Sequence, residues 1–410
     1  MRWRIRVETE SPLCLARRHT TTGLPVETLL YIPGSALRGT VASAWLRRYG
    51  ANSASSPEFQ SVFTSPGVRW GNLYPIHPSY KDKDSYPMPL SAQTCKWNSG
   101  FWTDDVEDEA GDGVWDILLW QAARKAGKRA PDEVEQCPIP SCGAPLDDAD
   151  GFYRHGEYGL ASAKTKTRLL ARTALMETTE TAKAAMLFTL EAIEELQEFA
   201  GFIEIPDNAV GINKLKQFLR SGQTYRIGSA KTRGLGAISI ADNPMTIDHY
   251  LNLDPVDNRL NAFQDQAIQC GLDNDRFWFS LTLYSDAIVI DVYGRFRSVI
   301  DETALKLEER FWGGQPAFPN SLRYELAFAR THIISGWNMA PGWRLPKYDV
   351  VAISKGSVFL FSVDANDQAQ VKLCLQKLEA EGLGDRKQEG FGQVIVSSPF
   401  HADPKGGAPQ

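Results

Sequence analysis

Residues 228–240 read GSAKTRGLGAISI, and residues 384–396 read GDRKQEGFGQVIV. Both stretches place three glycines in the same pattern, follow an amphipathic segment with helical spacing, and run into an alternating segment typical of a strand. Glycine permits positive φ angles and lets another backbone approach closely. The repetition therefore predicts two copies of one supersecondary unit, each ending in a glycine-rich loop and a strand.

The first loop differs from the second in its charges. Bare amides beside cations suit a phosphate chain, which predicts a ligand site in the first loop. A tight helix-to-strand turn without a ligand is the alternative, and it applies equally to the second loop, where Asp385 and Glu389 stand beside the basic residues. The candidate ligand residues of the first loop are Gly228, Lys231, Thr232, Arg233, Gly234 and Gly236.

Charge is segregated along the chain of 410 residues, whose formal net charge is −6. Residues 211–236 and 158–176 contain bases and no acids, whereas residues 104–116 contain acids and no bases. Such segregation favours a local polyanion-binding surface on an acidic body, although charge runs are also common on plain solvated faces. The basic candidates outside the loop itself are Lys164, Lys166, Arg168, Arg172 and Arg226.

Composition indicates a globular protein, with 43% hydrophobic and 23% charged residues. The sequence contains no stretch of about 18 apolar residues, so no membrane span is predicted. The first nine residues alternate like a strand and lack the apolar core of a signal peptide. Six scattered cysteines do not make a disulfide scaffold, so we expect a cytoplasmic protein that does not contact membranes.

A helix is predicted from Ser35, as its N-cap, to a stop at Gly50. Arg38 falls in the first turn, where a cation is unfavourable beside the helix dipole. A residue that breaks a local rule is a functional candidate, and the amides of a helix start can bind phosphate. Arg38 is thus a candidate phosphate ligand, with an ordinary surface arginine as the alternative.

Residues 77–158 change in character, becoming acidic and rich in proline and glycine, which suggests an insertion. Two cysteines separated by four residues and followed by glycine, as in 137–143, fit half of a structural zinc site. The predicted ligands are Cys95, Cys137 and Cys142, with His155, His77 or Asp112 as the fourth.

The remaining pattern predicts an α+β fold. Residues 167–175 and 185–191 form a long hairpin, although a helix over 181–199 competes with this interpretation. The first half then has the order β-α-β-insertion-β-β-α-β, which is ferredoxin-like. In the second half, residues 241–262 are expected to be a connection, and a strand pair and a helix over 369–380 precede the second glycine-rich loop.

The chain resembles the RAMP superfamily of CRISPR-associated proteins. The resemblance rests on the two glycine-rich loops and on IPGSALRG at 32–39. Three further segments resemble the Csx-type RAMP subunit of type III-D effector complexes: PLSAQTCK at 89–96, GVWD at 113–116, and the knuckle at 137–146 followed by GFY at 151–153. Relatives tend to carry a histidine at the position of Asp112. The sequence therefore departs from the family pattern at a candidate for the fourth zinc ligand.

The resemblance implies two ferredoxin-like, RRM-type RAMP domains, over 1–245 and 246–410, with the cysteine-containing insertion in the first. It implies a subunit that caps the 5′ repeat-derived tag of a CRISPR RNA beside the large Cas ten-type subunit and the RAMP backbone subunits, and that meets target RNA indirectly. By motif match, the helix-start residues Gly34, Ser35 and Arg38 and the first loop would contact the RNA. Tyr31 and Tyr225, beside these two sites, are weaker candidates for base stacking.

An enzymatic alternative is a metal-independent endoribonuclease that processes CRISPR RNA. That chemistry needs a general base for the ribose 2′-hydroxyl, and His19, in the basic segment 17–23, is the candidate. A pure assembly subunit without RNA contacts is a third interpretation. We expect no catalytic activity, and at most a structural zinc ion as cofactor.

Overall fold

The computed structural model describes residues 1–16, 27–64, 67–102, 110–131, 133–156, 159–175, 182–247, 253–313, 315–338 and 345–402. The fold is α+β, and its sheets are antiparallel. Within the described ranges, no helix has the length and apolar character needed to cross a membrane.

The first sheet has the strand order β12-β13-β1-β11-β2, and β14 also pairs with β1. Helices cover one face of this sheet, and β11 and the part of β2 after Arg69 are buried throughout because Tyr74 and Phe202 pack in a second cluster on the other face. The strands are β1 (Arg2–Thr9), β2 (Arg69–Ile76), β11 (Glu198–Glu204), β12 (Thr224–Arg226), β13 (Ala237–Ile240) and β14 (Met245–Ile247).

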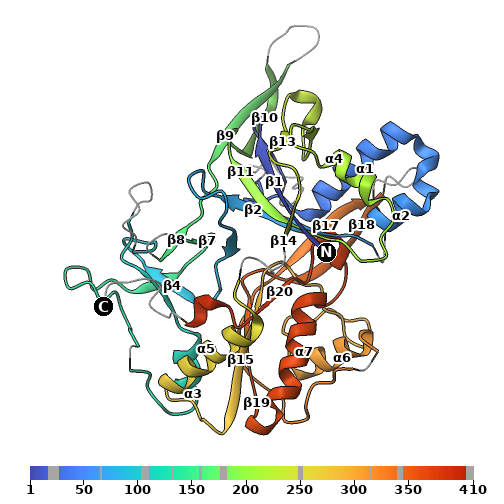
Figure 1. The fold of residues 1–410 in the computed structure, drawn as a ribbon. Helices are drawn as coiled ribbons and strands as arrows, with labels where there is room; N and C mark the ends of the chain where they lie inside the picture. Colours follow the sequence, from blue (N-terminus) through green and yellow to red (C-terminus); the bar gives the residue numbers. More distant parts are fainter. Residues whose placement is uncertain are drawn as a thin grey trace.

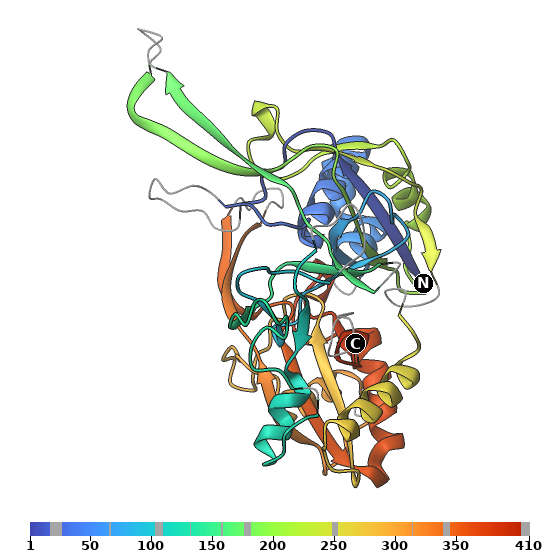
Figure 2. The same cartoon turned by 90° about the vertical axis from the view of Figure 1, so that its left-hand side faces the viewer.

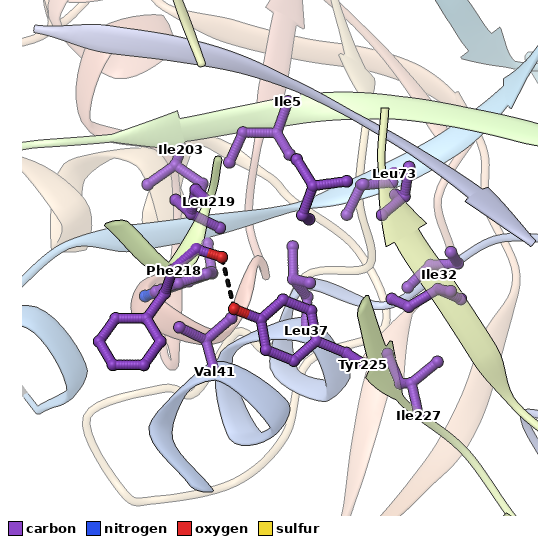
Figure 3. Close-up of a cluster of buried hydrophobic side chains, with 14 of the residues drawn as sticks. Ile5, Ile32, Leu37, Val41, Leu73, Ile203, Phe218, Leu219, Tyr225 and Ile227 are labelled. Atoms are coloured by element: carbon purple, nitrogen blue, oxygen red, sulfur yellow. Dashed lines mark hydrogen bonds between the residues drawn. The ribbon is translucent and has the colours of Figure 1, made fainter. Parts of the chain in front are cut away.

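Three helices lie with this sheet: α1 (Gly34–Tyr49), α2 (Pro57–Phe63) and α4 (Ile212–Phe218). Leu37, Val41 and Trp45 of α1 are buried, since a spacing of four residues puts them on one helix face. Figure 3 shows Leu37 and Val41 pointing towards Ile5 of β1 and Ile203 of β11. The predicted end of α1 at Gly50 is confirmed, with φ of 87°. The predicted N-cap is wrong: the helix begins at Gly34 after Pro33, and the Ser35 side chain lies inside the first turn.

The second sheet has the strand order β16-β19-β15-β20. The order β13-β1-β11-β2 of the first sheet matches the order β20-β15-β19-β16 of the second: counted along the chain, the fourth strand pairs with the first, the first with the third, and the third with the second. Figure 1 shows the first sheet above the second. The strands are β15 (Arg276–Leu283), β16 (Arg323–Phe328), β19 (Val358–Asp364) and β20 (Val394–Val396). The helices of this half are α5 (Val256–Gln269), α6 (Glu302–Phe311) and α7 (Gln368–Glu381).

Helix α5 corrects the expected connection at 241–262, as does β14. The signal was present in the sequence, since Val256, Leu260, Phe263 and Ala267 recur with helical spacing and the last three are buried. Strand β14 pairs with β1, so the first sheet extends to Ile247, beyond the expected boundary at 245.

Two long hairpins extend from the sheets: β9 (Thr167–Leu175) with β10 (Ala182–Ile193), and β17 (Thr331–Asn338) with β18 (Leu345–Ile353). Figure 2 shows the first of them, in green, projecting from the rest of the molecule. The hairpin interpretation of this region is confirmed, and the competing helix over 181–199 is wrong.

Residues 85–162, which overlap the segment 77–158 predicted to be an insertion, form two small sheets, β3-β7-β8 and β5-β4-β6, and one helix in the part that the structure describes. Trp115 and Trp120 pack in one buried cluster with Trp278 and Leu360, so the insertion covers part of the second sheet. Its elements are β3 (Ser85–Pro87), β4 (Ala92–Cys95), β5 (Val114–Asp116), α3 (Leu118–Lys125), β6 (Leu146–Asp148), β7 (Phe152–His155) and β8 (Leu160–Ser162).

Candidate nucleic-acid interface and metal cluster

The first glycine-rich loop has positive φ at residues 228, 230, 234 and 236, around a short 3-10 turn, η2 (Lys231–Arg233). Two of its glycines are required by close contacts. A Cβ on Gly228 would lie 2.4 Å from the carbonyl oxygen of Cys14, and one on Gly236 would lie 2.0 Å from that of Ile227. The backbone of the loop is therefore fixed by its glycines.

The second glycine-rich loop repeats this backbone around η5 (Lys387–Glu389). Its positive φ angles fall at residues 384, 386, 390 and 392. The offset from 228 to 384 is 156 residues, and the same offset relates 230 to 386, 234 to 390 and 236 to 392. The two sequence motifs thus fold into the same loop structure, as their repetition predicted.

Both loops bind the segment that follows the first strand of their own sheet. In the first loop, Ser229 donates its backbone N–H to Cys14 O (2.8 Å) and Gly236 donates to Pro12 O (2.9 Å). In the second loop, the corresponding bonds run from 385 to 288 and from 392 to 286, each 2.8 Å long. Residues 12–14 are consequently the platform on which the first loop lies.

The same platform carries the base of the β9–β10 hairpin. Leu13 and Ile193 exchange two backbone hydrogen bonds of 2.9 and 2.8 Å. Ala192 pairs with Arg168 across the hairpin, and Glu194 donates its N–H to Lys166 O (3.0 Å). The first basic run therefore contacts residues 12–14 directly, and the second run is joined to them through β10.

The cations of the two runs differ in what they contact. In the first loop, Lys231, Thr232, Arg233 and Gly234 are exposed, whereas Arg226 also donates to the carbonyls of residues 231 (3.1 Å) and 235 (3.4 Å).

In the hairpin, Lys164 and Lys166 are exposed. Arg168 pairs with Glu195 (2.9 Å), and Arg172 lies in β9 beside Phe188.

The second loop is covered, unlike the first. A Cβ on Gly390 would lie 2.5 Å from Trp70 O in β2, so the loop packs against the first sheet. The carboxylate of Glu389 contacts Arg38 Nη1 (3.2 Å) and Lys347 Nζ (2.6 Å). Although burial raises the pKa of Glu389, the hydrogen bond from Lys347 and the nearby cations hold it below its usual range.

The predicted phosphate ligands at the start of α1 lie at this contact. Arg38 donates to Phe63 O (3.1 Å) and pairs with Glu389. Gly34 donates its N–H to the Asn72 side chain (3.0 Å), and a Cβ on Gly34 would lie 1.9 Å from Trp70 O. The structure thus brings Gly34, Ser35 and Arg38 to the second loop, and their contact with RNA stays a prediction.

The two tyrosines proposed for base stacking are buried. Tyr225 is 7% exposed, belongs to the core of the first sheet, and donates to Phe218 O (2.5 Å), as Figure 3 shows. Burial raises its pKa to about 12. Tyr31 is 6% exposed, packs against Tyr74, and has Lys355 Nζ 4.4 Å from its ring centroid. In this structure neither ring exposes a face on which a base could stack, because both rings pack in hydrophobic clusters.

The three cysteines of the predicted metal site come together with Asp112. One possible ligand atom from each of the four residues lies within 4.8 Å of the others. Cys95 and Cys142 Sγ are 3.5 Å apart, and Cys137 Sγ lies 3.2 Å from Asp112 Oδ2. Tetrahedral zinc with bonds of about 2.3 Å would place its sulfur ligands about 3.8 Å apart. The cluster could therefore hold a metal ion with little movement.

Local hydrogen bonds orient this cluster. The side chain of Asn98 donates to Asp112 Oδ1 (2.7 Å), and its backbone N–H lies 3.5 Å from Cys95 Sγ. Cys137 donates its N–H to Ala144 O (2.8 Å), which closes the knuckle. Burial, with the Asp112 hydrogen bond, raises the pKa of Cys137 to about 12, so a metal ion would have to displace a proton there.

The other two candidates for the fourth ligand lie elsewhere. The His155 ring packs edge-on against Tyr86, 5.8 Å between centroids. The His77 ring lies beside Tyr80, and its Nδ1 accepts from Ser79 N (3.2 Å). Among the described residues, Asp112 is therefore the fourth member of the cluster.

One buried polar network has no evident signal in the sequence. His401 Nδ1 lies 2.7 Å from Asp116 Oδ2, and its Nε2 lies 2.8 Å from Thr282 Oγ1. The side chains of His401 and Asp116 are at most 1% exposed, so the network joins the insertion to the second sheet and is closed to substrate. The proposed base His19 lies outside the described residues.

Comparisons with known proteins give structural similarities only. No protein-family model and no curated protein matches the sequence. A chain of the type III-B Cmr-beta complex bound to cognate target RNA is similar in structure over 96% of both chains, with 10% identity and a TM-score of 0.43. Cmr4 is similar over 60% of this chain and 100% of its own, with 11% identity and a TM-score of 0.25. Cas6 in a product complex is similar over 50% and 79%, with 10% identity and a TM-score of 0.29. The function proposed below therefore rests on the residues of this chain.

Proposed function

We propose that this chain is an RNA-binding structural subunit of a type III CRISPR effector complex. It would hold the 5′ repeat-derived tag of the CRISPR RNA and bridge the large Cas ten-type subunit and the RAMP backbone subunits. The observation that carries the proposal is that residues 12–14 bind both the exposed glycine-rich loop of the first basic run and strand β10, which pairs with the second basic run in β9.

Comparison with the second loop supports an anionic ligand for the first loop. The counterpart of Glu389, 156 residues earlier, is Arg233. In the second loop this position faces two cations, Arg38 and Lys347. In the first loop this position carries the opposite charge, that of Arg233, and its side chain is exposed. This favours an anionic partner. A phosphate chain is the anion that combines with cations and backbone amides of this kind.

The proposal includes two ferredoxin-like domains that correspond to the two sheets. It is supported by the common strand order and by the two separate buried cores, which share no residue. The boundary would follow β14, a few residues after the expected position at 245.

The metal proposed for the cysteine cluster is zinc, held by Cys95, Asp112, Cys137 and Cys142. Three thiols and one carboxylate are ligands that zinc accepts, and four protein ligands leave no open position for catalysis. The ion would fix the loops of the insertion and would take no part in chemistry.

The direct test is to purify the complex with its co-expressed neighbours and a CRISPR array, crosslink it with ultraviolet light, and sequence the bound RNA. Crosslinks from residues 226–236 or 164–168 to a uniform 5′ repeat tag would support the proposal. An intact complex whose RNA never crosslinks to this chain would contradict it and would leave a protein-only assembly subunit.

A further inference from the structure

A cleft of about 330 Å³ lies where the insertion meets the chain leading into α5 and the C-terminal turn. Its volume falls at the lower end of the range for small-molecule sites, enough for one planar ring system. None of the residues that line it belongs to the cysteine cluster or to either glycine-rich loop. The lining residues include Lys83, Tyr86, His155, Leu253, Asp254 and Pro399.

Three polar side chains on this cleft make no side-chain hydrogen bond or ion pair with the described residues, and two of them, Lys83 and Asp254, are exposed. Neither ring nitrogen of His155, nor Nζ of Lys83, nor the carboxylate of Asp254 forms a hydrogen bond or ion pair with them. By contrast, the neighbouring Asp84 also lines the cleft but is bound to Arg4 Nε at 2.8 Å. Single unpaired surface charges are common, but a lysine, an aspartate and a histidine that line one cleft together offer a ligand both hydrogen-bond donors and acceptors.

One wall of the cleft is the half-buried ring of His155, which lies against buried aromatic rings. Tyr86 is 3% exposed and stacks on Tyr153 with centroids 5.3 Å apart, and the His155 ring stands edge-on to it. Burial, and then the charge of Lys83, lower the pKa of His155 against the opposing charge of Asp254, which favours the neutral imidazole.

We infer that this cleft binds a single guanine base, an inference that rests on the proposed RNA-binding function and adds a base-reading site to it. Guanine presents two adjacent donors, N1–H and the N2 amino group, which a carboxylate such as Asp254 can accept together. It also presents O6 and N7, the acceptors to which a lysine such as Lys83 donates. Proteins that read an unstacked base combine such edge contacts with stacking on a ring, a role that the half-buried imidazole of His155 can take.

The test uses the full chain and free nucleotides, so it does not depend on the glycine-rich loop. Calorimetric titration with guanosine, adenosine, cytidine and uridine 5′-monophosphates should show preferential binding of the guanosine nucleotide. Asp254→Asn should weaken that binding roughly ten-fold, because the amide loses one of two acceptors. Asp265→Asn, an exposed carboxylate on α5, is the matched control and should change nothing.

Equal affinity for all four nucleotides, or an Asp254→Asn variant that binds like the wild type, would overturn the inference. Lys83→Met provides a second variant with the same expectation. If the RNA binds through Lys231 and Arg233 but no guanosine nucleotide binds, the cleft inference alone fails. If the guanosine nucleotide binds but RNA affinity is indifferent to these two cations, the proposed role of the loop alone fails.

Discussion

Removing the two exposed cations of the first loop should change how RNA binding depends on salt. The variant is Lys231→Ala combined with Arg233→Ala. Both side chains are exposed on η2, and neither is needed for the backbone of the loop, which its glycines fix. Arg226 is left in place because it donates to two loop carbonyls, so its loss would disturb the loop itself.

The magnitude follows from counterion release. Each phosphate contact on a single strand contributes about 0.7 to the slope of log affinity against log salt concentration. If each of the two cations contacts one phosphate, the slope should fall by about 1.4. Between 50 and 200 mM salt, the wild type should then lose about seven-fold more affinity than the variant.

The assay is fluorescence anisotropy of a labelled single-stranded RNA that carries the repeat-derived tag, titrated at several salt concentrations. The matched control is Lys306→Ala combined with Arg310→Ala, which removes the same charge from α6. The control should retain the wild-type slope. An equal fall in slope for both variants would show that only net charge matters, and an unchanged slope in the loop variant would refute the loop as a phosphate site.

Four further outcomes are expected. Asp112→Ala should weaken zinc binding at least ten-fold, because even the loss of an outer-shell partner of a ligand lowers metal affinity about ten-fold or more. Asp112→His should retain zinc, as measured by plasma mass spectrometry. Glu389→Gln should destabilise the folded chain by about 1–2 kcal/mol at neutral pH. Because the folded pKa of Glu389 is lowered, this difference should be present above the usual glutamate range and disappear as pH falls through the folded pKa; a constant difference in urea unfolding would contradict the ion pair. His401→Ala should cost about 2–4 kcal/mol, since it leaves buried polar groups without their partner, and a wild-type urea midpoint would dismiss the network. His19→Ala should leave RNA products unchanged, and a total loss of RNA cutting would instead establish the endoribonuclease alternative.

Local features of the chain were predictable where backbone geometry follows from residue type. The glycines of the two loops demand positive φ, and both loops fold with the same pattern of angles. The α+β class, the end of α1 at Gly50 and the β9–β10 hairpin follow from spacing and alternation in the same way. Helix α5 was missed although its apolar residues repeat with helical spacing.

The positions of side chains relative to solvent were not predictable from neighbours in the sequence. Tyr31 and Tyr225 lie beside the expected phosphate ligands along the chain, yet both are buried, because their rings complete apolar clusters formed by distant strands. Arg38 breaks a local helix rule, as noted, but the reason is an ion pair with Glu389, 351 positions away along the chain of 410 residues. Among the candidates for the fourth metal ligand, only the fold could select Asp112.

The sequence by itself determined that this chain has two copies of one loop-forming motif, and it grouped three cysteines as candidate metal ligands. These depend on short-range requirements, namely glycine φ angles, apolar periodicity and ligand spacing. Only the tertiary structure decided that one loop is exposed and the other covered, and that residues 12–14 link the first basic run, through β10, to the second. Burial and charge pairing depend on contacts between segments hundreds of residues apart, and no local pattern encodes which surface of a repeated unit will be covered by its neighbour.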